Sequence, residues 1–392
     1  MKKVKLELFS TLFDQHTIPD FYSSISYFKN QKIFNDTTNH YNEQKSSKNL
    51  YSLRLVPGYM NFNLKNEELL NIKKIPQINW GYAIFLDSTS GIEDFINSQF
   101  KTKFRTNIKR SINRLETCFE ITYRMYHGDI DRETYIQLME SLRIMLINRF
   151  SEKNVVNNNL PKWKELCANT FSLIAQKKAS LFVIYNGDRP IAISLNYHLD
   201  KILFSSISSY DLDYSKFGIS HVEIYRQLEW CFLNNYLVFE MGVGSLDYKR
   251  RWSNHIYNYE HHVYYNKSFL SNCYAFFEIS RVKLKEYLKS KQIPEYISKG
   301  KAAINFEKKV HQDVLHNFEI ESTIDISLLK NSEKINFQND KYHYLRRPIY
   351  DFLYSTLDHV SKIQVFEIIK DTTYIISGKS ANQKVTFYKN TK

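Results

Sequence analysis

The chain has 392 residues, enough for two or three domains that each bury a core. Hydrophobic residues make up 43% and aromatic residues 15% of it, which excludes a disordered chain. The formal net charge is +13, but the basic residues are spread along the chain without a nucleic-acid-binding module, so nucleic acid is not the expected main partner.

Sequence features also bear on thiols, metals and location. The cysteines stand far apart, so neither a disulfide framework nor a metal site is predicted; they are Cys118, Cys167, Cys231 and Cys273. The first residues carry charges where a signal peptide needs an apolar core, and no apolar run reaches about eighteen residues. We therefore expect a cytoplasmic protein with no membrane span.

The first hundred residues mix aromatic-rich runs with polar loops. Leu53–Val56 and Tyr82–Leu86 are expected strands. From Glu93 to Leu115 the pattern predicts one basic helix with a shared face of Lys103, Asn107, Arg110 and Arg114. This face is either simply solvated or a basic surface near a phosphate-bearing ligand.

The middle of the chain has the clearest strand pattern. Phe119–Met125 alternates like a strand, and Arg132–Phe150 is an amphipathic helix with Ile136, Met139, Leu142, Leu146 and Phe150 on one side. An antiparallel three-strand meander is predicted next, over 180–185, 190–197 and 202–207. Its first turn contains Asn186-Gly187, a strong hairpin signal.

Helices and strands continue to the end of the chain. The pattern predicts a helix over 218–236, strands over 237–241 and 259–265, and a basic helix over 271–291. Beyond Pro294 we expect an appended unit with strands at 362–369 and 373–376, and no chemistry is assigned to it.

The stretch from Tyr210 to Trp252 contains three of the ten glycines. Scarce glycines are expected where the backbone needs a positive φ or close approach to a ligand. The loop before the helix of 218–236 suits an anion. The first N–H groups of a helix have no partner within it, and the positive end of the helix dipole lies at the same place. The predicted phosphate-binding residues are Lys216, Phe217, Gly218, Ile219 and Ser220.

This stretch resembles the acyl-CoA-binding element of the GNAT (Gcn5-related) N-acyltransferase superfamily, Arg/Gln-x-x-Gly-x-Gly/Ala. The run 215–220, Ser-Lys-Phe-Gly-Ile-Ser, keeps the central Gly and has Ser at the first and last positions. A wider set resembles the cellulose-biosynthesis acetyltransferase branch, which is similar to the Fem peptidoglycan aminoacyl transferases. That set is Phe104-Arg105-x-x-Ile108-Lys109-Arg110, Tyr210-Asp211 with Tyr214, Phe239-Glu240-Met241-Gly242 and Tyr248-Lys249-x-x-Trp252.

The resemblance implies an α/β (α+β) fold with a GNAT-like mixed sheet flanked by helices. It implies two tandem GNAT-like lobes and a C-terminal extension: a degenerate lobe over 1–99, an acyltransferase domain over 100–290 and an extension over 291–392. The implied activity moves an acyl group, in the first place acetyl from acetyl-CoA, to an amine. The acceptor would be an amino sugar of a surface glycan or its precursor, in polysaccharide biosynthesis.

The resemblance also assigns site residues. In the Fem relatives a Lys after an aromatic residue stabilises the oxyanion, and Tyr248-Lys249 matches that pair, in keeping with acyl transfer through a tetrahedral oxyanion. Glu240, Asp211 and Asp247 are candidates for the general base, and Glu240 stands out in an apolar strand. Tyr210, Tyr214, Tyr248 and Trp252 are the candidate substrate-binding rings. His255, His261 and His262 are not taken as metal ligands, since neighbouring strand residues face opposite ways.

Two alternatives remain open. The first is a Fem-type transferase that uses aminoacyl-tRNA, which the +13 charge would accommodate. The second is a protein that keeps the fold but acts as a non-catalytic scaffold or glycan-binding protein, and the altered Gly218 loop supports it.

Overall fold

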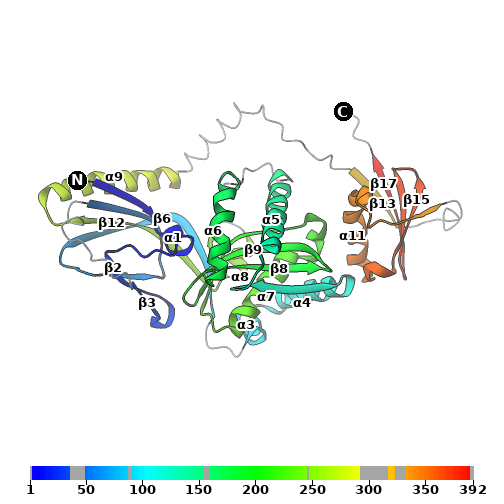
Figure 1. The fold of residues 1–392 in the computed structure, drawn as a ribbon, viewed down its shortest axis with the longest axis horizontal. Helices are drawn as coiled ribbons and strands as arrows, with labels where there is room; N and C mark the ends of the chain where they lie inside the picture. The colour runs from blue at the N-terminus through cyan, green and yellow to red at the C-terminus, as the bar shows by residue number, and fades with distance from the viewer. Residues whose placement is uncertain are drawn as a thin grey trace.

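The computed structural model describes residues 2–35, 49–86, 91–152, 157, 159–244, 247–291, 317–322 and 332–388. Its largest element is a nine-stranded mixed sheet in the order β1-β4-β12-β6-β11-β10-β9-β8-β7 (Figure 1). Their bounds are β1 Lys2–Glu7, β4 Asn49–Pro57, β6 Leu70–Phe85, β7 Ile121–Tyr126, β8 Ala179–Asn186, β9 Arg189–Leu199, β10 Ile202–Tyr210, β11 Val238–Val243 and β12 His255–Asn266. Within this sheet β1 with β4 and β10 with β11 pair in parallel, and the other neighbours are antiparallel.

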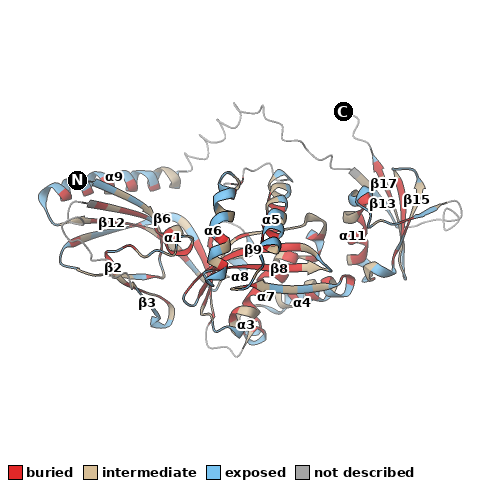
Figure 2. Ribbon diagram, viewed as in Figure 1, coloured by how far each residue is buried: buried red, intermediate tan, exposed pale blue. Residues whose placement is uncertain are grey.

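The predicted meander is confirmed as β8, β9 and β10. The Asn186–Arg189 pair closes the first hairpin, and Gly187 in its turn has φ 56°, a value that glycine adopts without the steric penalty of a side chain. Most residues of β9 are buried, as Figure 2 shows for the centre of the sheet, because helices cover both of its faces.

Two helical layers flank this part of the sheet. The helices α3 (Ile92–Gln99), α4 (Thr102–Cys118) and α7 (Ile219–Leu233) bury apolar side chains with Phe182, Leu203 and Phe239 in one cluster. On the other face α5 (Arg132–Glu152) and α6 (Trp163–Ala175) share a cluster with Val183 and Ile193. Alternate strand residues thus supply the two cores.

Two helix predictions are corrected. The single basic helix expected from Glu93 to Leu115 is two helices, because Phe100 between α3 and α4 has an extended backbone and its ring packs against Phe104 and Trp252. In α5, Ile136 is 57% exposed rather than part of the buried stripe. The neighbouring Tyr135 and Leu138 are buried in its place, which rotates the apolar side of the helix.

The N-terminal strands are part of the same large sheet. Strand β12 lies between β4 and β6 and pairs with both. Residues 255–266 therefore join the strands of residues 2–85 within one sheet. Helix α1 (Leu8–Phe13) packs in the same cluster as α5 and α6. A three-stranded sheet, β3-β2-β5, lies beside this half; its strands are β2 Tyr22–Ser26, β3 Lys32–Phe34 and β5 Asn61–Leu64.

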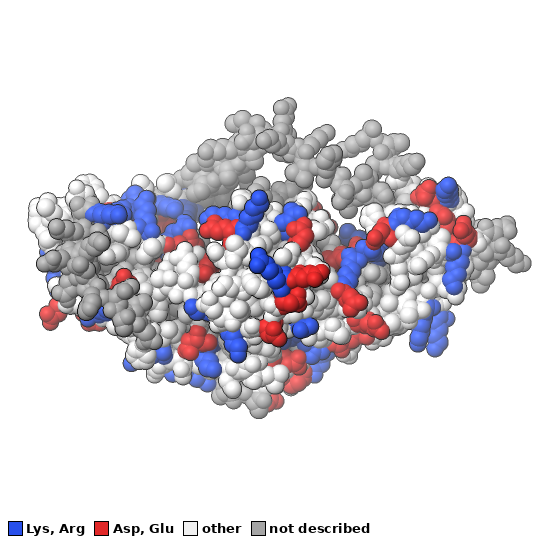
Figure 3. Space-filling model, in the orientation of Figure 1, with Lys and Arg blue, Asp and Glu red and all other residues white. Residues whose placement is uncertain are grey.

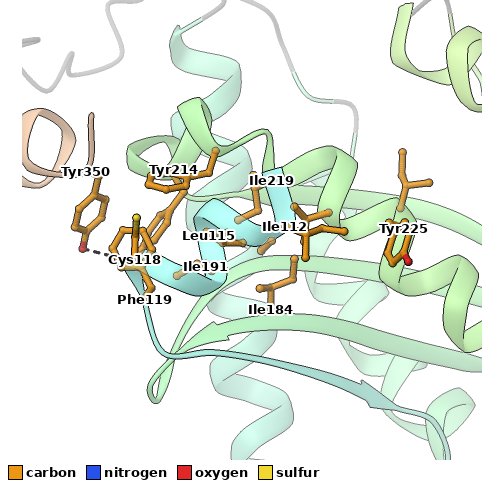
Figure 4. Packing of buried hydrophobic residues seen from close by; sticks show 14 of the residues in the cluster. Ile112, Leu115, Cys118, Phe119, Ile184, Ile191, Tyr214, Ile219, Tyr225 and Tyr350 are labelled. Carbon is orange, nitrogen blue, oxygen red and sulfur yellow. Dashed lines mark hydrogen bonds between the residues drawn. The ribbon is translucent and has the colours of Figure 1, made fainter. Parts of the chain in front are cut away.

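The last described residues form a separate unit. Five antiparallel strands lie in the order β13-β17-β16-β15-β14: β13 Asn317–Glu321, β14 Glu333–Ile335, β15 Gln364–Ile369, β16 Thr373–Ser377 and β17 Asn382–Tyr388. Helix α11 (Arg346–Thr356) covers this sheet and faces the main body (Figure 1). Its Tyr350 reaches the cluster of Phe119 and Tyr214, as Figure 4 shows.

The predicted fold class, a mixed α/β sheet flanked by helices with a C-terminal extension, is therefore confirmed. The division at residues 99 and 290 stays a prediction. Two further helices belong to the main body: α8 (Asp247–Trp252) follows β11, and α9 (Phe269–Ser290) packs against β4, β6 and β12.

Candidate active site

The parallel pairing of β10 with β11 is short. It comprises three residue pairs, from Ile202–Val238 to Phe204–Glu240. Beyond them β10 continues to Tyr210 beside β9, while β11 stays with β6 on its other side. The two strands therefore stop pairing at Glu240. The residues that follow Phe204 on β10 and Glu240 on β11 lie on either side of the point where the strands separate.

A β-bulge shapes β11 directly after Glu240. The register against β6 shifts between Glu240 and Val243, and Gly242 has φ 68°. Bulges re-aim side chains and backbone groups, and glycine tolerates this left-handed conformation. The bulge leaves the Met241 and Val243 carbonyl oxygens to accept hydrogen bonds from one side chain, that of Lys249.

Lys249 and Glu240 meet at this bulge. The Lys249 Nζ donates to Met241 O at 2.5 Å and to Val243 O at 3.0 Å. Glu240 Oε1 accepts from the Gly242 N–H at 2.7 Å. A lysine ammonium has three N–H donors, and groups of the described residues accept two of them here, which leaves one for a group brought close to these residues.

Burial shifts both of these groups toward neutral pH. Burial raises the pKa of Glu240 to about 7, opposed by the hydrogen bonds from Gly242 and Tyr257. Burial also lowers the pKa of Lys249 to about 8, opposed by the attraction of Glu240. Such paired shifts are common among groups that exchange protons in active sites.

Tyrosines surround Glu240 on the side away from α7. Tyr257 donates to Glu240 Oε2 at 2.9 Å and also lies 3.0 Å from the Tyr259 hydroxyl. Burial, reinforced by the Glu240 charge, holds the pKa of Tyr257 well above its usual value, so it remains a donor. Glu240 is thus a fully buried carboxyl group held in one orientation.

A second buried carboxyl group was not predicted. Glu223, on α7, accepts from Ser208 Oγ at 2.9 Å and from Gln227 Nε2 at 3.3 Å. Burial raises its pKa to about 7, opposed by these bonds and by Arg149. Its only sequence signal is an acidic residue between Val222 and Ile224 in an apolar run.

Two predicted substrate rings lie near Glu223. The guanidinium of Arg149 stands 5.0 Å from the centre of the Tyr210 ring and donates to Ser208 O at 3.4 Å. Tyr248 is half-buried; burial raises its pKa to about 12, and the charges of Glu223 and Arg149 act on it. Tyr210 and Tyr248 are therefore brought together with Glu223.

The predicted donor loop has the expected backbone. Gly218 has φ 66° and ends the short 3-10 helix η3 (Leu212–Phe217) as α7 begins. A Cβ at this position would lie 2.7 Å from Ser111 Oγ of α4, so the close approach shown here is to a neighbouring helix. The side chains of Phe217 and Ile219 are buried in the core, which leaves only their backbone for a ligand.

The remaining donor-loop side chains, Lys216 and Ser220, are not part of the buried core. Lys216 is exposed and lies 3.8 Å from the Asp351 carboxylate of α11, and Ser220 is half-buried. The N–H groups of Ile219 and Ser220 begin α7 and have no acceptor inside the helix. This arrangement fits an anionic ligand.

Three predicted site residues lie in structural contacts. Asp211 binds Arg189 at 2.5 Å and caps η3 through Asp213 N–H. The Tyr214 ring is fully buried and its hydroxyl accepts from Asn186 Nδ2 at 2.9 Å. Trp252 is fully buried and donates to His221 Nδ1 at 3.0 Å. In these positions Tyr214 and Trp252 have no ring face open to a substrate.

No group of three or more His, Cys, Asp or Glu side chains within the described ranges is placed to hold a metal ion. His261 instead lies 2.8 Å from Ser52 Oγ, and His262 lies 2.6 Å from Glu260 Oε2. None of the described helices is both long and apolar enough to cross a membrane.

The segment that contains this candidate site matches a known protein family. Residues 102–250 match the family described as Acetyltransferase (GNAT) domain, from the first residue of α4 into α8. The match covers less than half of the chain and supports an acyltransferase of the GNAT type. No curated protein matches the chain significantly.

Solved structures show weaker likenesses. A conserved protein of unknown function from Bacteroides thetaiotaomicron VPI-5482 has a TM-score of 0.38 and 9% identity over 57% of this chain and 72% of that chain. FemX has a TM-score of 0.41 and 9% identity, over 57% and 73%. A GCN5-related N-acetyltransferase from Sphaerobacter thermophilus has a TM-score of 0.29 and 9% identity, over 55% and 59%.

Proposed function

We propose that the chain transfers an acyl group, in the first place acetyl, from acyl-CoA to an amine. The observation that carries this proposal is the Lys249–Glu240 arrangement at the point where β10 and β11 stop pairing, inside the segment that matches the GNAT domain. Two groups with pKa values moved toward 7 and 8 suit proton movement at neutral pH.

The reaction is direct. The amine nitrogen attacks the thioester carbonyl carbon, the C–S bond breaks, and the thiolate of CoA leaves with the electron pair. The free N–H of Lys249 would stabilise the oxyanion formed in between. Glu240 would receive the proton lost by the amine, through Tyr257 if the amine does not reach the carboxylate itself.

The donor phosphates would lie at the start of α7. Lys216 supplies a cation, and the N–H groups of Ile219 and Ser220 lie at the positive end of a fifteen-residue helix. Gly218 is needed for the turn that exposes these groups, as its φ of 66° indicates.

The proposed acceptor is an amino sugar of a surface glycan or its precursor. The half-buried rings of Tyr210 and Tyr248 would contact the sugar, whereas the fully buried Tyr214 and Trp252 would hold the fold around it. Asp211 would order the loop through Arg189 rather than accept the proton.

A second candidate is transfer from aminoacyl-tRNA, favoured by a basic groove between α4 and the end of α11. It is a hollow of about 380 Å³ lined by Thr106, Lys109, Arg110, Asn113, Arg114, Thr117 and Leu357. Steep loss of tRNA affinity with salt would support this candidate.

Thermal unfolding with acyl-CoAs tests the donor. Acetyl-CoA should raise the midpoint temperature of unfolding of the purified protein, and Lys216→Ala should reduce that rise. Lys177→Ala is the control and should not reduce it, because Lys177 lies on an exposed turn between α6 and β8 and outside the donor loop. A flat response to a panel of acyl-CoAs would rule out the donor assignment. Mass spectrometry of the protein as purified should find bound CoA or acyl-CoA.

A further inference from the structure

Helix α9 is apolar on the side that does not pack. Its inner face buries Ser271, Ala275, Glu278, Val282 and Glu286 against β4, β6 and β12. At 100° per residue the opposite face carries large apolar side chains that are more than half exposed. They are Phe269, Phe276, Phe277, Leu284 and Tyr287, with exposed fractions of 80%, 66%, 71%, 57% and 58%.

Such a face is unusual for a helix at the surface of a globular protein. One side of such a helix normally packs, and the other is polar. Scattered exposed apolar residues need no explanation, but here they gather on one continuous strip of a 22-residue helix. We call this strip, with Leu270, the outer face of α9.

The carboxylates of α9 lie on its inner face, away from the apolar strip. Its two carboxylates, Glu278 and Glu286, both point inward. Glu278 accepts from Ser52 Oγ at 2.7 Å and binds Arg281, and Glu286 binds Lys289 at 2.8 Å and accepts from the Ile78 N–H. The outer face therefore carries no carboxylate of this helix.

Cations flank the outer face on both sides. On the helical wheel Lys283 lies along one edge of the apolar strip, and Arg281 and Lys285 lie along the other. All three are exposed. Figure 3 shows Lys and Arg atoms interleaved with uncharged atoms in the region where Figure 1 places α9.

We propose that the outer face of α9 docks on an anionic lipid bilayer, with the helix in the plane of the surface. Aromatic and aliphatic side chains would enter the headgroup region while the flanking cations bind lipid phosphates. An apolar strip, cations on both edges and inward carboxylates together fit this surface. The proposal does not depend on the acyltransferase activity.

Vesicle co-sedimentation of the full chain tests it. The protein should bind vesicles of phosphatidylcholine mixed with phosphatidylglycerol, bind phosphatidylcholine alone far less, and lose binding as salt rises. The double variant Phe276→Ser/Phe277→Ser should weaken binding at least about tenfold, because two interfacial aromatic anchors are lost. Lys283→Glu/Lys285→Glu should also weaken binding at least about tenfold, because two cations near the anionic surface are replaced by anions.

Leu233→Ser is the matched control, because Leu233 is 78% exposed on a different helix and should leave binding unchanged. Each variant should keep the wild-type circular dichroism and thermal midpoint, since these side chains are exposed. Absence of binding to anionic vesicles, or equal binding by wild type and both double variants, would overturn the proposal. A dimer in light scattering that Phe276→Ser/Phe277→Ser converts to a monomer would overturn it in favour of self-association.

Discussion

The hydroxyl of Tyr350, on α11, lies 3.4 Å from the hydroxyl of Tyr214, in the turn that leads to α7. Helix α4 makes two further contacts with α11. Cys118 Sγ donates to the Leu353 carbonyl oxygen, and the Arg114 guanidinium donates to the Tyr354 carbonyl oxygen. The C-terminal unit is therefore packed on the elements that carry the proposed donor loop.

This packing predicts a stability effect at Tyr350. Tyr350→Ala should lower the free energy of unfolding by about 3 kcal/mol, because it empties a site against Phe119 and Tyr214. Tyr350→Phe removes only the hydroxyl and should cost about 1 kcal/mol. Denaturant unfolding measures both, and equal losses would show that the ring does not pack here.

Lys249 is expected to act in the chemical step. Lys249→Met should lower kcat by about a hundredfold or more, as for loss of one oxyanion donor, while the KM for acyl-CoA changes little. Arg250→Met, at the next and exposed position of α8, is the control and should stay near wild type. Release of the CoA thiol provides the assay, and an unchanged kcat for Lys249→Met would contradict the role.

Glu240 should make stability depend on pH. Because folding raises its pKa from 4.5 to about 7, its contribution to stability is present below pH 4.5 and is lost as pH rises through about 7. Glu240→Gln cannot titrate, so its stability relative to wild type should improve by about 3 kcal/mol between pH 4.5 and pH 8. Denaturant unfolding at both pH values, with Glu67→Gln at an exposed carboxylate as control, measures the change; a pH-independent difference would argue against a buried Glu240.

Glu240 and Glu223 can be separated by pH–rate profiles. Both carboxyl groups have pKa values raised to about 7 by burial. If Glu240 takes the proton, the acidic limb of kcat/KM near pH 7 should disappear in Glu240→Gln and persist in Glu223→Gln. The reverse result would assign the proton transfer to Glu223.

Gly218 and Gly187 form a matched pair of glycines. Both have left-handed backbones, with φ of 66° and 56°, but only at Gly218 would a Cβ meet another atom within 4 Å, Ser111 Oγ at 2.7 Å. Gly187→Ala should cost about 1–2 kcal/mol for the backbone alone, and Gly218→Ala should cost more. Gly218→Ala should also reduce the thermal shift caused by acetyl-CoA, which Gly187→Ala should leave intact.

Local patterns in the sequence predicted local structure well. The Asn186-Gly187 turn and the alternation around it predicted the meander, and the rarity of glycine predicted the left-handed backbone at Gly218. The break at Phe100 was not predictable, because the helical pattern runs through it and only the packing of its ring on Trp252 requires the bend.

The candidate site was predicted in part. Lys249 and Glu240 were named separately, and the structure brings them to one bulge. Glu223 was missed because its hydrogen-bond partner Ser208 belongs to another element, β10, that no local pattern connects to it. Trp252 was named as a substrate ring, but its burial depends on Phe100 and Phe104, which no local pattern connects to it.

The position of β12 has a consequence for how the chain folds during synthesis. Tyr51 of β4 pairs with Tyr264 of β12, and β6 pairs with β12 along most of its length. At 5–20 residues per second the ribosome needs about ten to forty seconds to make the chain between those two tyrosines. Until β12 is made, the edges of β4 and β6 that face it in the folded sheet have no partner strand. The nascent chain is therefore most exposed to aggregation and to chaperones during this interval.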